Sequence, residues 1–270
     1  MKPSFLIIGG QKCGTTSLYQ YLCEHPQVVS ARRKEVSFFT GNFNKGNNWY
    51  LKQFPRVESQ EIITGEASPN YIFYPHTPQR VYEFFPEMKL VALLRDPVER
   101  AISHYYHNRK MNQIIKKGKK REPLSFEMAI ERENRRIKGD IKRLQIDNNY
   151  NRCYNFNHYS YLTKGIYVDQ LKRWMEVFPR EQLLIFKSEH FFKNPSITLK
   201  EVLEFLDLPE FELPEYKQRN KGTLKKAKKK SISDSLKLQL AEYFQPHNQR
   251  LEEFLGMKFD WDKKYQNLEI

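Results

Sequence analysis

The fold is decided by Phe5-Leu6-Ile7-Ile8-Gly9-Gly10-Gln11-Lys12-Cys13-Gly14-Thr15-Thr16-Ser17-Leu18, close to the start of the chain. Four consecutive apolar residues are followed by a turn bounded by glycines and by three hydroxyl residues that open an amphipathic run. This order predicts a buried strand, a phosphate-binding loop and a helix start. We expect the helix to continue to residue 24, with its amino end pointing at an anion held by the loop.

The glycine spacing of this loop nearly matches the nucleotide-triphosphatase motif G-x-x-x-x-G-K-[ST]. Gly9 and Gly14 stand at the two glycine positions, and Thr16 fills the hydroxyl position. Thr15, however, occupies the place of the lysine that reaches the terminal phosphates of a nucleoside triphosphate. The only lysine, Lys12, lies inside the loop. The loop therefore indicates an anionic donor that is not a nucleoside triphosphate.

Apolar runs and helical periodicity alternate along the rest of the chain. Further buried strands are predicted at 89–94 and 183–186, and a strand that runs into an irregular loop is predicted over 61–71. Helices are predicted over 78–85, 97–109, 125–138, 167–178, 196–206 and 233–244. This alternation predicts an α/β fold, a single P-loop-type three-layer domain over 1–270 with a central parallel sheet flanked by helices. A basic and polar stretch at 108–160 is interpreted as an insertion.

The composition narrows the class of protein. With 270 residues and 39% hydrophobic content, the chain can bury one sizeable core. Its formal charge of +14 calls for an anionic partner: nucleic acid, an acidic membrane surface, an acidic glycan or a small polyanionic cofactor. The sequence carries no signature of a nucleic-acid-binding module, so we expect no specific nucleic acid partner.

The cysteines and the apolar runs bear on the compartment. Cys13, Cys23 and Cys153 are odd in number and lack metal-ligand spacing, which argues against a disulfide framework and a metal site. No apolar run approaches membrane-spanning length, and the first strand begins too close to Met1 to leave room for a signal peptide. The sequence predicts a cytoplasmic protein without a transmembrane segment.

Two further groups of residues are candidates for the site. Arg95 follows the predicted strand 89–94, and Ser103 lies two turns into the next helix, so both can share one anion at the carboxyl edge of the sheet. Glu35 lies beside the three basic residues 32–34. A carboxylate beside cations stays ionised and suits the role of a base, although a surface salt-bridge cluster explains the same pattern.

Several segments together resemble the sulfotransferase family, more specifically the heparan sulfate N- and O-sulfotransferase domains and their bacterial relatives. The segments are 7–18, Lys34-Glu35-Val36-Ser37-Phe38-Phe39, 44–50, Leu94-Arg95-Asp96-Pro97 with its continuation to Ser103, 165–167 and 259–261. The resemblance covers most of the chain and leaves out the stretch at 108–160. It implies transfer of a sulfuryl group from 3′-phosphoadenosine-5′-phosphosulfate to a hydroxyl or amine, without a metal, leaving adenosine 3′,5′-bisphosphate.

By this resemblance, the loop binds the 5′-phosphosulfate of the donor, and Lys12 faces the oxygen that leaves sulfur. Arg95 and Ser103 would hold the 3′-phosphate. The predicted donor-binding residues of the loop are Gln11, Lys12, Cys13, Gly14, Thr15, Thr16 and Ser17. A basic loop later in the chain would close over the donor through Lys221, Gly222, Lys225 and Lys226.

The resemblance also implies that Glu35 is the general base. It would accept the acceptor's proton during an in-line displacement at sulfur while Lys12 stabilises the leaving oxygen. His104 and His107 are rival bases, because small-molecule sulfotransferases use histidine. One position departs from the pattern: Ala67 stands where the O-sulfotransferase relatives have a lysine, which puts a heparan-like acceptor in doubt. The acceptor class stays open between a glycan, a lipid and a small molecule.

Two other functions are alternatives to a sulfotransferase. A P-loop kinase or nucleotide hydrolase fits the glycine spacing, but Thr15 in the lysine position and the pair of Arg95 and Ser103 oppose it. A basic nucleic-acid-binding protein fits the charge of +14. Binding of the donor product, compared with binding of ATP or DNA, separates the three functions.

Overall fold

The computed structural model describes residues 1–57, 59, 61–114, 121–151, 153–217, 232–266 and 268. The chain forms two compact units. The first comprises Met1–Arg95, Asn148–Arg152 and Leu171–Asn220, and the second comprises Asp96–Asp147, Cys153–Gln170 and Lys221–Ile270.

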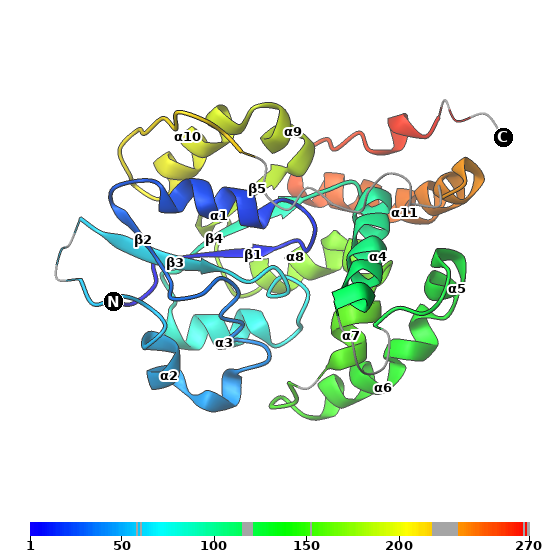
Figure 1. Ribbon diagram of the computed structural model, residues 1–270, viewed down its shortest axis with the longest axis horizontal. Helices are drawn as coiled ribbons and strands as arrows, with labels where there is room; N and C mark the ends of the chain where they lie inside the picture. Colours follow the sequence, from blue (N-terminus) through cyan, green and yellow to red (C-terminus); the bar gives the residue numbers. More distant parts are fainter. Residues whose placement is uncertain are drawn as a thin grey trace. The chain divides into compact units, whose positions relative to one another are not determined.

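A parallel sheet forms the centre of the first unit (Figure 1). Its described strands are β1 (Phe5–Gly9), β2 (Val28–Ser30), β3 (Ile63–Ala67), β4 (Lys89–Leu94) and β5 (Leu183–Lys187). They lie in the order β2-β3-β1-β4-β5, and every neighbouring pair is parallel. All residues of β1 are buried, as expected for the continuous apolar runs of a parallel sheet covered on both faces.

Helices cover both faces of this sheet. Those described in the first unit are α1 (Thr15–Cys23), α2 (Asn47–Leu51), α3 (Thr77–Phe84), α9 (Ser188–Lys193), α10 (Pro195–Phe205), the short η1 (Phe43–Lys45) and η3 (Arg180–Gln182), and the end of α8 (Tyr167–Met175). Figure 1 shows α1 and α10 on one side of the sheet and α3 on the other. Leu18, Val202 and Val91 join α1, α10 and the sheet in one apolar core. The predicted α/β fold with a central parallel sheet flanked by helices is therefore confirmed.

The second unit is helical in the part that the structure describes. It contains α4 (Pro97–Ile114), α5 (Phe126–Glu131), α6 (Glu133–Ile146), α7 (Tyr154–Tyr159), η2 (Thr163–Gly165), the start of α8, α11 (Asp234–Leu255) and η5 (Asp262–Lys264). Its core joins Ala101 of α4, Phe126 of α5 and Phe244 of α11. Phe126 comes from the stretch at 108–160, so this stretch contributes to a core, and its interpretation as an insertion in a single domain stays a prediction.

Several predicted boundaries differ from the structure. The helix predicted over 125–138 divides into α5 and α6 at Arg132. The last helix is predicted to end at residue 244, but it continues to Leu255. Pro246 removes one backbone hydrogen bond of the helix, and the burial of Asn248 and Leu251 in the following turn offsets that loss. Neither β2 nor α7 is predicted from the sequence. None of the described helices combines the length and the apolar character needed to cross a bilayer.

Candidate active site

The loop between β1 and α1 has the geometry of an anion site. Gly10 N–H donates to the Leu93 carbonyl at 2.6 Å, and Cys13 N–H donates to the Gly10 carbonyl at 3.1 Å, so the loop is closed against the neighbouring strand β4. The amino end of α1 has no side-chain cap and no acidic residue in its first turn. The backbone N–H groups of residues 14–16 have no acceptor within the described part of the chain. Such uncapped N–H groups at a helix start bind anions.

Backbone conformation in this loop depends on close packing. Lys12 has φ of 74° and Gly14 has φ of 101°, both in the left-handed region. A Cβ atom at Gly14 would lie 2.8 Å from Cζ of Phe192, so only glycine fits both the conformation and the space. The site residues of the loop also differ in exposure: Gln11, Lys12 and Thr16 are partly exposed, whereas Cys13 and Ser17 are fully buried. The side chain of Cys13 is therefore part of the core, and its predicted contact with the donor stays a prediction.

Two side chains from other strands fix this loop. Arg95 follows β4, and its Nη1 donates to the Lys12 carbonyl at 3.3 Å. Ser188 follows β5, and its Oγ donates to the Cys13 carbonyl at 2.6 Å. The structure thus brings Arg95 to the loop, whereas its contact with a 3′-phosphate stays a prediction. Ser188 is not among the residues predicted from the sequence. The feature that could have identified it is a hydroxyl residue directly after an apolar strand, at the carboxyl end of the sheet.

The turn that carries Glu35 lies between β2 and η1. Glu35 is exposed, and Lys34 Nζ lies 3.2 Å from its Oε1. Glu35 has φ of 62° and Ser37 has φ of 53°, which places two residues with side chains in the left-handed region close together. Backbone strain of this kind gathers at functional sites. The geometry agrees with a functional turn, and the role of Glu35 as a base stays a prediction.

A fully buried carboxylate, Glu66 of β3, contacts this turn. Its Oε2 accepts Val36 N–H at 3.1 Å and the Ser68 hydroxyl at 2.6 Å, and its Oε1 accepts the Tyr71 hydroxyl at 2.7 Å. Burial raises the pKa of the Glu66 carboxyl, and the hydrogen bonds from Ser68 and Tyr71 oppose that shift. No role is predicted for Glu66 from the sequence. A single acidic residue inside a buried strand is the feature that could have identified it as important.

Ala67 lies in the apolar core and not at a polar surface. It is fully buried and pairs with Ile7 of β1. The position where the O-sulfotransferase relatives were expected to have a lysine is therefore occupied by a buried methyl group. The doubt about a heparan-like acceptor, which rests on the missing lysine, stays a prediction.

The remaining candidates on α4 belong to the second unit. Ser103 is half-buried, as is His107. His104 has no exposed surface, and its ring lies 4.8 Å from that of Tyr161. Burial, together with the charges of Lys164 and Arg100, lowers the pKa of His104 well below its usual value. Its burial disfavours His104 as the base for an acceptor arriving from solvent. The predicted sharing of one phosphate by Ser103 and Arg95 stays a prediction.

Four predicted donor contacts, Lys221, Gly222, Lys225 and Lys226, lie outside the described residues. Within the described residues, no group of three or more His, Cys, Asp or Glu side chains is arranged to hold a metal ion.

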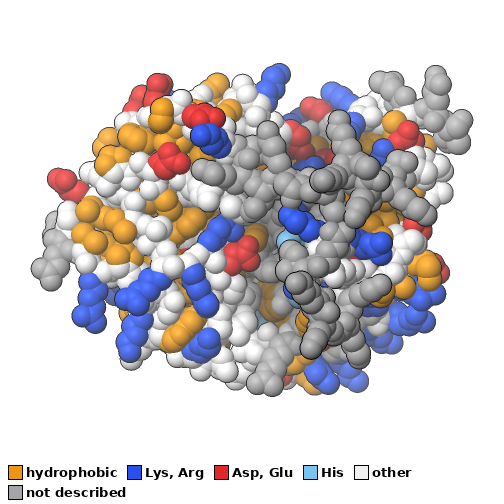
Figure 2. Space-filling model, in the orientation of Figure 1, with side chains coloured by type: hydrophobic (Ala, Val, Ile, Leu, Met, Phe, Trp, Pro, Cys, Tyr) orange, Lys and Arg blue, Asp and Glu red, His pale blue; other side chains and the backbone are white. Residues whose placement is uncertain are grey.

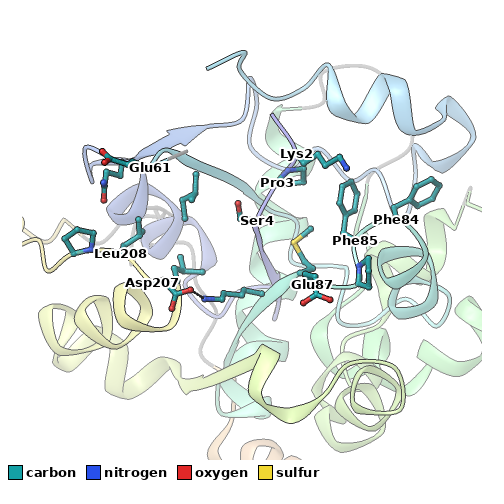
Figure 3. Close-up of a pocket in the computed structure, with 16 residues that line it drawn as sticks. Lys2, Pro3, Ser4, Glu61, Phe84, Phe85, Glu87, Asp207 and Leu208 are labelled. Carbon is teal, nitrogen blue, oxygen red and sulfur yellow. Dashed lines mark hydrogen bonds and ion pairs between the residues drawn. The ribbon is translucent and has the colours of Figure 1, made fainter. Parts of the chain in front are cut away.

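A pocket of about 730 Å³ opens at the amino ends of the strands, opposite the ends that carry the loop between β1 and α1 (Figure 3). It is lined by Ser4, Ile63 and Lys89, which stand at the amino ends of β1, β3 and β4, and by Phe85 and Leu208. Asp207 forms an ion pair with Lys89 at this pocket. None of the predicted site residues lines it. Ligands of parallel α/β sheets bind at the carboxyl ends of the strands, which are the ends that carry the loop and Arg95.

Comparison with known proteins gives the family. The model of the sulfotransferase domain matches residues 2–265. The chain is 29% identical over 322 residues to the membrane-associated sulfotransferase kil1 of Dictyostelium discoideum, covering 96% of this chain and 66% of that protein. It is 29% identical over 286 residues to the human heparan sulfate glucosamine 3-O-sulfotransferase 5, covering 96% of this chain and 74% of that protein.

A solved structure agrees with these sequence matches. The crystal structure of a sulfotransferase from Alicyclobacillus acidocaldarius superimposes with a TM-score of 0.77 and 28% identity, covering 97% of this chain and 99% of that one. The chain spans 66% of the length of the Dictyostelium protein and 74% of that of the human protein. The match of the family model across residues 2–265 shows that this chain belongs to the sulfotransferase family.

Proposed function

We propose that the chain transfers a sulfuryl group from 3′-phosphoadenosine-5′-phosphosulfate to a hydroxyl or amine of a carbohydrate acceptor. The observation that carries this proposal is the loop between β1 and α1. Its lysine lies inside the turn, at Lys12, and the helix start offers uncapped N–H groups. These donors, and the glycine that Phe192 requires at position 14, fit the phosphosulfate end of the donor. When bound, the donor supplies the activated sulfuryl group.

In this reaction each predicted site residue would have a separate role. The N–H groups at the start of α1 bind the 5′-phosphate, and Arg95, with Ser103, binds the 3′-phosphate. Lys12 places its ammonium group where negative charge grows on the leaving oxygen. Glu35 accepts the proton of the acceptor as the acceptor attacks sulfur. Lys34 Nζ lies 3.2 Å from Glu35 Oε1, so a cation stands beside the proposed base.

A carbohydrate acceptor is supported by the surface beside Glu35. Arg33 and Lys45 lie over the ring of Trp49, at 5.4 Å and 4.4 Å from its centre. Arg32 and Lys52 are exposed. Figure 2 shows Lys and Arg side chains gathered over the part of the first unit that carries α2. Cations beside an aromatic ring suit an acidic sugar chain, and the human relative is named for heparan sulfate. Lipids and small molecules are the competing acceptors.

Calorimetry with adenosine 3′,5′-bisphosphate tests the donor assignment. We expect this product to bind without magnesium and ATP to bind more weakly. Tight, magnesium-dependent ATP binding with no affinity for adenosine 3′,5′-bisphosphate would contradict the proposal. Radiolabelled donor, offered with unsulfated acidic glycans, glycolipids and phenols in parallel, then identifies the acceptor class. Labelling of phenols alone would overturn the carbohydrate assignment while leaving the donor assignment intact.

We also propose a reducing, cytoplasmic location. All three cysteines are thiols, and their odd number does not suit a disulfide framework. The Dictyostelium relative is named as membrane-associated, which makes the membrane fraction the competing location. Fractionation of the source cells with an antibody against the chain tests this proposal. Recovery in a membrane fraction would contradict it.

A further inference from the structure

We infer that Glu66 is a positioning residue for catalysis, which holds the backbone of the Glu35 turn in its reactive shape. The inference rests on the proposed role of Glu35 as the base. Glu66 is fully buried, so it contacts neither the acceptor nor the donor and acts through the turn alone. The hydrogen bonds of Glu66 and its partner Ser68 hold the backbone of residues 36 and 37.

The turn needs support because its backbone is strained. Glu35 and Ser37 both have positive φ, and Val36 lies between them. Residues with side chains are disfavoured in this region, and they stay there only when the surroundings hold them. A relaxed turn would move the Glu35 carboxylate, and misplacement of a catalytic group by about 1 Å costs about 100-fold in rate.

The support reaches the turn at its centre. Glu66 Oε2 accepts Val36 N–H at 3.1 Å, between the two strained residues. The next N–H group, that of Ser37, donates to Ser68 Oγ at 3.0 Å, and the Ser68 hydroxyl donates to the same Oε2 at 2.6 Å. One carboxylate oxygen thus holds two successive N–H groups, the first directly and the second through Ser68.

The other carboxylate oxygen extends the support to Phe39, just past the turn. Tyr71 donates its hydroxyl proton to Glu66 Oε1 at 2.7 Å, and the hydroxyl oxygen accepts Phe39 N–H at 3.4 Å. The strand pairing explains the arrangement: β2 and β3 are parallel neighbours, so the chain leaving β2 passes the carboxyl end of β3 (Figure 1). A carboxylate is suited to this place because both of its oxygens accept and neither donates.

Two substitutions at Glu66 separate positioning from bulk stability. Glu66→Leu removes every acceptor, and we expect kcat to fall about 100-fold while the Kd of adenosine 3′,5′-bisphosphate changes less than about twofold. Glu66→Gln keeps one oxygen for Val36 N–H, so we expect kcat within about tenfold of wild type. A merely structural role would lower donor affinity and kcat together.

Glu133→Leu is the matched control. Glu133 is also buried and also accepts two backbone N–H groups, those of Leu162 and Thr163, but its turn carries no proposed catalytic residue. We expect a lower unfolding temperature, with kcat per folded molecule within about twofold of wild type.

The decisive measurement repeats Glu66→Leu in a Glu35→Gln background. If Glu66 acts through Glu35, the second substitution should lower the residual rate by less than about twofold. An undiminished 100-fold loss in both backgrounds would overturn the inference. Near-normal activity of Glu35→Gln alone would instead overturn the assignment of the base. Should Glu66→Leu fail to fold, Ser68→Ala, which removes the acceptor of Ser37 N–H, must lower kcat without weakening the donor product, and unchanged kcat would overturn the inference.

Discussion

Two of the strained segments in the first unit are stabilised in different ways. The loop at residues 10–14 holds Lys12 at φ of 74°, and the turn at residues 34–37 holds Glu35 at φ of 62°. The first loop is closed by its own backbone and by the strand and helix that flank it, with Arg95 and Ser188 as additional contacts. The second depends on Glu66 and Ser68, which lie about thirty residues further along the chain.

This difference explains which loop has a shape that can be predicted from the sequence. The first loop is a local motif, since its strand, glycines and helix start are consecutive. The second carries a recognisable basic and aromatic pattern, but no local feature predicts its backbone shape, which depends on hydrogen-bond acceptors from the partner strand. The shape of the loop between β1 and α1 is therefore encoded locally, whereas the turn that carries the proposed base depends on tertiary contacts.

The largest effect is expected from the second loop, through Glu35→Gln. Loss of a general base lowers kcat by about 10²- to 10⁴-fold, and we expect a decrease near 10³. The Kd of adenosine 3′,5′-bisphosphate should stay within about twofold, because the amide keeps the shape of the turn. Steady-state kinetics and calorimetry measure the two quantities. Glu83→Gln, at an exposed position of α3, is the control with wild-type kinetics. A near-normal rate for Glu35→Gln would remove it as the base.

A slightly smaller effect is expected from the first loop, through Lys12→Ala. Removing one group that stabilises charge in the transition state lowers kcat by about 10²- to 10³-fold. Because Lys12 also contacts the ground-state donor in the proposed mechanism, affinity for the product should fall as well, by less than about tenfold. Single-turnover kinetics with labelled donor measures the chemical step, and Lys200→Ala, exposed on α10, is the control. A purely binding defect, with kcat preserved, would assign Lys12 to donor affinity alone.

The next effect is expected from Arg95, which contacts the first loop and is the proposed ligand of the 3′-phosphate. Loss of a charge-assisted hydrogen bond corresponds to about 10- to 100-fold in affinity, so Arg95→Ala should weaken adenosine 3′,5′-bisphosphate by that factor. Adenosine 5′-phosphosulfate, which lacks the 3′-phosphate, should lose less than about threefold. Competition binding with both ligands makes the comparison. Equal losses would show that Arg95 acts by holding the Lys12 carbonyl and not by binding a 3′-phosphate.

The smallest effect is expected on the free energy of unfolding in acid. It depends on the second unit and not on the two loops of the first unit. His104 of the second unit is buried, which lowers its pKa well below the usual value, so the folded protein keeps it neutral. The unfolded chain protonates it below about pH 6.5, and the free energy of unfolding should therefore fall as the pH drops, by about 1.4 kcal/mol per pH unit from this residue.

His104→Phe should remove this dependence. Urea unfolding at pH 7.5, 6.5 and 5.5 should give a shallower slope for the variant by about the amount that one histidine contributes. His190→Phe, at an exposed position of α9, should keep the wild-type slope. Identical slopes for His104→Phe and wild type would contradict the burial argument.

Much of the fold follows from local patterns. The apolar runs that became β1, β4 and β5 are long enough to be recognised, and they predict the parallel sheet. β2 has three residues, too few for a pattern, and it forms because β3 offers a free edge. α11 continues past Pro246 because Leu251 finds a buried place, which no local preference predicts.

The candidate site divides in the same way. Lys12, Arg95 and Glu35 are predicted from the sequence because each stands in a motif or at a strand end. Ser188 and Glu66 were missed because each acts on a backbone group far away in the sequence. A side chain of this kind has no neighbours in the sequence that mark its role.

The sequence by itself determined the phosphate-type loop and the parallel α/β core, because the residues that make them are consecutive or periodic. Only the tertiary structure decided how the Glu35 turn is held. That turn takes its shape from hydrogen bonds to Glu66, Ser68 and Tyr71, and the pairing of β2 with β3 brings these acceptors to it. In this turn the strained backbone is maintained by distant partners, and distant partners meet only when the sheet assembles.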